Sequence, residues 1–170
     1  NQFGIQINHR NRKTWSRDWR MFTTKKIEPL IKSECNFIRD LNFEFIDVYR
    51  IKNDESKYRQ SGGTKAAKNL LNSFLSSRHQ NYQFLMSSPS SSESSCSRLS
   101  PHIAYGTISI RDIVTRLNLQ IENENNVDKK SLVSFKKRLA WHCHFIQKFY
   151  DEPAIEYQNM NRAYDGLRED

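Results

Sequence analysis

Apolar residues recur every three or four positions in three separate stretches, and this spacing constrains the fold more than any other feature. The first stripe is Ala66, Ala67, Leu70, Leu71, Phe74 and Leu75. The second is Ile110, Ile113, Val114, Leu117 and Ile121. The third is Leu132, Phe135, Leu139, His142, Phe145, Ile146 and Phe149. Residues at this spacing share one face of an α-helix, whereas a strand alternates every second residue, so the sequence predicts an all-α fold.

Residues typical of helix ends flank these stripes. Small polar side chains stand near each beginning, where they can accept hydrogen bonds from unpaired backbone N–H groups. The capping residues that we expect are Thr64, Ser109 and Asp128, for helices over 64–77, 109–121 and 129–150. Pro153 lacks a backbone N–H group, so we expect it to end the last helix.

Residues 97–101, between the first two stripes, combine residue types that are typical of a helix start. We expect a short helix over 101–105, with Ser100 as its N-cap and Gly106 at its end. The loop before it would place hydroxyl groups, the Arg98 guanidinium and backbone N–H groups at the positive end of a helix dipole, which is a combination that binds anions. A capped helix that binds nothing explains the same residues, and without further context it is the preferred interpretation.

Residues 1–22 combine basic and aromatic side chains. Trp15, Trp19 and Phe22 would share one helical face. The basic residues beside that face are Arg12, Arg17 and Arg20. Such a mixture suits nucleic acid, because phosphates attract cations and bases stack on rings. The alternative, which we favour, is a helix that docks its tryptophan face on a core.

Two stretches show no single period. Residues 26–58 carry scattered apolar side chains and are left as a connector, with a helix beginning near Pro29 as one option. Residues 86–97 are rich in serine, and by composition they are typical of a flexible linker or a phosphorylation target.

Composition limits the partners and the compartment. The 27 basic and 19 acidic residues give a net charge of +8, which favours a polyanionic partner, although a basic surface without a partner fits equally well. No stretch approaches the ~18 apolar residues of a membrane span, so we expect no membrane partner.

The three cysteines are widely spaced and odd in number, which fits a reducing compartment, and we expect a cytoplasmic protein. The chain begins with neither Met nor an apolar leader, so we expect a fragment of a longer chain without a signal peptide.

Three metal-binding residue types follow one another at His142-Cys143-His144. Consecutive helical residues point about 100° apart and cannot chelate one ion together. A role for His142 in the core or in a pocket lining is therefore the favoured interpretation, and the sequence predicts no metal site. The cysteines are expected to be ordinary thiols. The chain contains no Ser-His-Asp order, Walker motif or Rossmann fingerprint.

The order of these motifs resembles the FAD-binding half of the cryptochrome/photolyase family, over roughly residues 60 to 150. The resemblance rests on Gly-Gly-Thr-Lys-Ala-Ala-x-x-x-Leu-x-x-Phe from Gly62, Tyr82, Ser97-Arg98-Leu99-Ser100-Pro101, the following Gly106, Ile108, Ser109 and Arg111, and Leu139-Ala140-Trp141. It implies a linker or helical connector over 1–60. It also implies that 61–170 is the N-terminal part of the helical FAD-binding domain, without the family's α/β antenna domain and the C-terminal part of the flavin domain.

The resemblance also implies roles for particular residues. Those that would bind the pyrophosphate and adjoining parts of FAD are Cys96, Ser97, Arg98, Leu99 and Ser100. Tyr82 would touch the phosphate or ribitol region, and Phe135 would pack near the flavin. Arg138 stands where repair enzymes of the family carry a Glu or Gln that faces the lesion and the flavin, and Trp141 matches a Trp that stacks on the damaged base pair.

The function that the resemblance implies is blue-light-dependent repair of UV-damaged DNA. In such a lyase, reduced FAD passes an electron to a pyrimidine photoproduct that has been flipped out of the duplex. Arg138 reverses the charge expected beside the flavin and Cys96 replaces a Thr, so enzymatic activity is left open. Two alternatives remain: a cryptochrome-like light-sensing flavoprotein without repair activity, and a truncated basic nucleic-acid-binding module without flavin. The oligomeric state is also left open.

Overall fold

A computed structural model describes residue 3, residues 12–28, residue 56 and residues 59–167 of the protein. Within these ranges the regular elements are helices and none is a strand, which confirms the all-α prediction. The α-helices are α1 (Arg12–Thr24), α2 (Thr64–Ser73), α3 (Tyr82–Leu85), α4 (Ser92–Ser95), α5 (Ser100–Ala104), α6 (Ile110–Asn123) and α7 (Asn126–Asp151). A π-helical turn, η3 (Phe74–Arg78), extends α2, and two 3₁₀ turns, η4 (Pro153–Glu156) and η5 (Arg162–Tyr164), follow α7.

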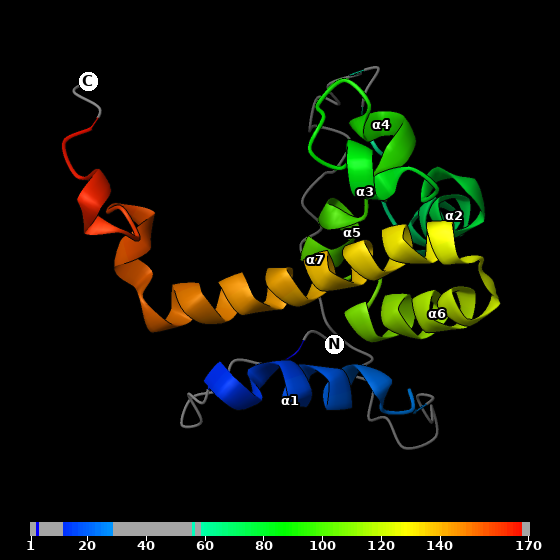
Figure 1. Cartoon of the computed structure of the whole chain (residues 1–170), viewed down its shortest axis with the longest axis horizontal. Coiled ribbons are helices and arrows are strands. Elements are labelled where there is room, and N and C mark those ends of the chain that lie inside the picture. The colour runs from blue at the N-terminus through cyan, green and yellow to red at the C-terminus, as the bar shows by residue number, and fades with distance from the viewer. Residues whose placement is uncertain (1–2, 4–11, 29–55, 57–58, 168–170) are drawn as a thin grey trace, which may run out of the picture.

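The long helix α7 is the central element, and the other helices pack mainly along its first half (Figure 1). Helix α6 contacts α7 as its hairpin partner, and α1 contacts α6. Helices α2 to α5 gather mainly on the opposite side of α7 from α1, where α3 contacts α7 (Figure 1). The C-terminal end of α7 projects beyond this assembly (Figure 1).

The predicted stripes supply the core. The stripe residues exposed by 5% or less on the three main helices and the π turn are Ala67, Leu71, Phe74, Ile110, Ile113, Val114, Leu117, Leu132, Phe135 and Leu139. The third stripe is buried only in its first half, because Phe145 and Phe149 are each 45% exposed on the projecting part of α7. Cys143, which the stripe did not include, is 2% exposed instead.

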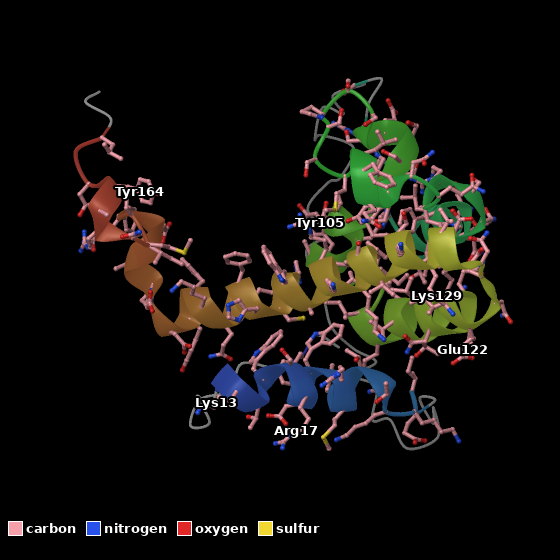
Figure 2. The ribbon with its side chains drawn as sticks, in the orientation of Figure 1. Lys13, Arg17, Tyr105, Glu122, Lys129 and Tyr164 are labelled. Atoms are coloured by element: carbon pink, nitrogen blue, oxygen red, sulfur yellow. The ribbon has the colours of Figure 1, made fainter. Side chains whose placement is uncertain are left out.

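The N-terminal aromatic face is confirmed as a packing surface. Trp19 is 3% exposed, and Trp15 packs against the same core and lies 5.4 Å from the His144 ring of α7. Arg17, by contrast, points away from α7 (Figure 2). His9, Cys35 and most of the connector over 26–58, including the helix expected near Pro29, lie outside the described residues.

One of the three expected long-helix caps is confirmed. The Ser109 hydroxyl accepts a hydrogen bond from the Asp112 N–H at 3.0 Å, at the start of α6. The expectation for Thr64 is wrong, because Gly63 is the N-cap of α2 and makes no side-chain cap. The expectation for Asp128 is also wrong. The side chain of Asn125, three residues earlier, accepts from the Val127 and Asp128 N–H groups at 2.9 and 3.0 Å, so α7 begins sooner.

The short helix α5 begins and ends one residue earlier than expected, and Gly106 terminates it as expected. Ser100 is its first residue and is not its cap, because Leu99 occupies the N-cap position without a side-chain hydrogen bond. Gly106 adopts a positive φ of 68°. The Gly106 N–H donates to the Ile103 carbonyl, and the Thr107 N–H donates to the His102 carbonyl at 2.9 Å, which is the paired pattern that ends a helix at a glycine.

The serine-rich stretch is partly structured, which corrects its interpretation as a linker. Ser92–Ser95 form the single turn α4. Serine hydroxyls support this turn by donating back to carbonyls, as Ser95 Oγ does to Ser91 O at 2.6 Å. Within the described ranges, the structure contains no helix both long and apolar enough to cross a bilayer.

Candidate functional site

The loop between α4 and α5, over residues 96–99, is held in an unusual conformation. Arg98 has a φ of 57°, and among the described residues it is the only one other than glycine with a positive φ. The Leu99 side chain on one side of it is 1% exposed and anchors the loop in the core. The Leu99 N–H points at the Ser97 hydroxyl at 3.4 Å. Conformations of this kind are energetically costly and cluster at functional sites.

The Arg98 side chain has two partners. Its guanidinium lies 3.5 Å from the Glu93 carboxylate of α4. With its amide oxygen turned toward this guanidinium, Gln60 accepts from Arg98 Nε and Nη2 at 2.9 and 3.1 Å and donates to the Arg98 carbonyl at 3.1 Å. The guanidinium is therefore positioned beside the loop, and its side chain remains 28% exposed.

A second guanidinium, from Arg78, supports the same loop from within. It donates to the Cys96 carbonyl, to the Leu70 carbonyl at 2.9 Å and to the Ser73 hydroxyl at 3.0 Å. Burial lowers the pKa of Arg78, and the nearby positive charge of Arg98 lowers it further. Sequence reasoning missed Arg78, although its place in a last helical turn, where basic side chains often bind carbonyls, could have identified it.

Tyr82 and Phe135 lie in the core behind this loop. Both rings pack on Phe74, at centroid distances of 5.5 and 4.7 Å, and on each other at 5.6 Å. The pKa of Tyr82 is raised to about 12, mainly by burial and to a smaller extent by the nearby Cys96, while Arg138 partly opposes both effects. The structure thus brings both Cys96 and Arg138 within electrostatic reach of Tyr82.

Arg138 and Trp141 form an exposed pair one helical turn farther along α7. The Arg138 guanidinium lies over the Trp141 ring, 5.1 Å from its centroid, and Trp141 is 55% exposed. No described contact joins Trp141 to the Arg98 loop. The predicted residues therefore fall into three groups: the loop with Ser97, Arg98 and Leu99, the buried rings of Tyr82 and Phe135, and this outward-facing pair.

The loop has the chemistry of an anion site. Two guanidinium groups lie close enough for one to lower the pKa of the other, and the Glu93 carboxylate, 3.5 Å from Arg98, already offsets part of this repulsion. A left-handed residue next to a right-handed one, as at Arg98 and Leu99, also turns successive N–H groups toward one side, a geometry that binds phosphates. The residues present therefore fit a diphosphate. Phe135 is only 4% exposed and does not itself form a surface for an isoalloxazine ring.

Comparison with known proteins identifies no relative: no family model, no curated protein and no solved structure matches this chain.

Proposed function

We propose that this chain binds FAD through the 96–100 loop and belongs to a photolyase-like or cryptochrome-like flavoprotein that acts on DNA. The observation that carries the proposal is the left-handed backbone of Arg98, which lies between the Cys96 carbonyl bound by Arg78 and the buried Leu99 anchor. A strained non-glycine residue at a basic loop is accounted for if the loop serves an anionic ligand.

Different residues of the chain would bind the cofactor and support the loop. Ser97, Arg98 and the loop N–H groups would hold the diphosphate, and Arg78 would keep the loop in place through the Cys96 carbonyl. Reduced FAD, when bound, supplies electrons on excitation by blue light. Arg138 occupies the position where repair enzymes of the family carry a Glu or Gln. It would therefore place a positive charge near the cofactor.

The Arg138–Trp141 pair supports contact with nucleic acid. A half-exposed indole that carries a guanidinium on its face offers a platform on which an unstacked base can lie, with a cation available for the adjacent phosphate. The net charge of +8 would attract the DNA backbone.

The test of the FAD site compares two ligands that share an isoalloxazine ring. Equilibrium dialysis should show that the protein binds FAD and that it binds riboflavin, which lacks the diphosphate and the adenosine, at least about tenfold more weakly. Arg98→Gly retains the left-handed backbone and removes the charge, and it should weaken FAD binding without weakening riboflavin binding. Arg17→Met, on the outer face of α1, is the matched control and should bind FAD normally.

Two results would reject the FAD site: no FAD bound by folded protein, or equal FAD affinity in the Arg98→Gly variant and the parent protein. The DNA contact has its own test. Trp141→Ala should weaken binding to a UV-irradiated oligonucleotide by about 5- to 100-fold. Tyr164→Ala, which removes an exposed ring far from α7's midpoint (Figure 2), should not. If both variants bind DNA equally, the platform assignment is wrong.

A further inference from the structure

Three side chains with metal-binding atoms converge where η3 ends and the α6–α7 hairpin turns. They are His79, directly after η3, Glu124, which is the C-cap of α6, and Asp128 in the first turn of α7. One ligand atom of each lies within 4.8 Å of the corresponding atoms of the other two. His79 is far from Glu124 and Asp128 in the sequence, and its meeting with them is a product of the fold.

The His79 ring is oriented so that one of its nitrogen atoms is available to bind a cation. It is 1% exposed, and its Nδ1 lies 3.0 Å from the Phe74 carbonyl. A carbonyl only accepts hydrogen bonds, so Nδ1 carries the proton, and Nε2 is left with a lone pair in the neutral ring. Nε2 is buried and has no hydrogen-bond partner, and the nearest carboxylate oxygen, Glu124 Oε1, is 3.6 Å away. A lone pair that faces a carboxylate is repulsive unless a proton or a metal ion lies between them.

Each of the two carboxylates accepts a hydrogen bond from a neighbouring amide side chain. Glu124 Oε1 accepts from Gln120 Nε2 at 2.5 Å, and Asp128 Oδ2 accepts from Asn125 Nδ2 at 2.9 Å. The Glu124 side chain is 19% exposed, and Asp128 is also partly buried. Partners that orient a ligand in this way, like the carbonyl behind His79, are the usual outer contacts of a metal site.

We propose that His79, Glu124 and Asp128 bind a zinc-type divalent cation. One imidazole and two carboxylates are ligands that Zn²⁺ accepts, whereas Mg²⁺ and Ca²⁺ prefer oxygen alone. Three protein ligands leave a fourth position for water. Tetrahedral ligands about 2.0–2.1 Å from zinc lie roughly 3.3 Å apart, so the ligand atoms close by about 1.5 Å at most on binding, which side-chain rotation can supply. The ion would join η3 to the α6–α7 hairpin.

The experiment titrates metal-free protein with ZnCl₂ in a calorimeter and follows thermal unfolding in parallel. We expect one Zn²⁺ per chain and a rise in Tm of roughly 5–10 °C when free zinc is about 100 times Kd. Glu124→Gln and Asp128→Asn should each raise Kd at least about tenfold. Glu122→Gln, an exposed residue at the end of α6 (Figure 2), is the matched control and should leave Kd unchanged.

Two further measurements separate this site from zinc bound by surface histidines or by Cys143. A Co²⁺-loaded sample should show d–d bands without thiolate charge transfer, and MgCl₂ should not compete at millimolar levels. The proposal fails if folded protein binds no zinc, if the two carboxylate variants bind it like the parent protein, or if Co²⁺ shows thiolate ligation. His79 is fully buried and its variants can unfold, so the carboxylate variants decide the question.

Discussion

Replacing Arg78 by Met should destabilise the protein and loosen the loop that its guanidinium supports. The side chain donates to the Leu70 and Cys96 carbonyls and to the hydroxyl of Ser73. Ser73 is exposed and can turn to water, so the two carbonyls account for most of the loss. Hydrogen bonds from a charged donor contribute about 1.5–3 kcal/mol each.

The expected net loss is smaller than the sum of these contacts. Burial lowers the pKa of Arg78, which means that its charge is partly desolvated in the folded state, and Met avoids that cost. Met also keeps an apolar stem near the Phe74 ring, over which the guanidinium carbon lies at 5.8 Å. We therefore expect the free energy of unfolding to fall by about 2–4 kcal/mol, and Tm to fall by roughly 5–12 °C.

The assay is urea unfolding of the parent protein, Arg78→Met, Arg78→Lys and the surface control Arg17→Met. Lysine keeps the charge but not the planar fork, so Arg78→Lys should recover less than half of the loss. Hydrogen exchange at the Ser97 and Leu99 amides should accelerate in Arg78→Met before exchange in α6 does. Unfolding within about 0.5 kcal/mol of the parent protein, a difference typical of a surface substitution, or full recovery by lysine, would refute this account of the clamp.

Three further predictions concern single side chains. Burial raises the pKa of the Cys143 thiol, so iodoacetamide followed by peptide mapping should modify Cys143 far more slowly than the half-buried Cys96, and equal rates would contradict the burial. Burial lowers the pKa of His142 below its usual 6.5. The unfolded chain then binds the proton first, so stability is complete above about pH 6.5 and falls below it, and His142→Gln should reduce this slope in urea unfolding at pH 7.5 and 5.5. Ser109→Ala should cost about 1 kcal/mol of unfolding free energy by removing the α6 cap, whereas the exposed Ser94→Ala should change it little.

The main helices could be predicted from the sequence because apolar residues at helical spacing mark the face of each helix that is buried. Ile113, Val114 and Leu117 were expected in one stripe, and each is fully buried. The exact starts were less predictable, because several polar residues near a helix start can cap it. Asn125 precedes Asp128 by three residues, and only the geometry of the turn shows that Asn125 reaches the free N–H groups.

The candidate site was predictable in part for a similar reason. The Ser97–Pro101 block identified the loop, but the sequence does not record which distant side chain supports it. Arg78 lies 18 residues before Cys96 and reaches its carbonyl only because the π turn faces that way. The His79, Glu124 and Asp128 cluster was missed because its members come from separate elements, while the conspicuous His142-Cys143-His144 run cannot converge on one ion.

The π turn η3 has a consequence for chain length. The His79 N–H donates to the Phe74 carbonyl five residues earlier, so this turn holds one residue more than an α-helical turn would. Ser76 and Ser77, both exposed, contribute no packing that a neighbour could not replace. Deleting either would let the turn close as an α-helix with four residues in place of five, so Arg78 and His79 would keep nearly the same direction relative to α2. A one-codon deletion within α2 itself has no extra residue to remove, and it would rotate both side chains by about 100°.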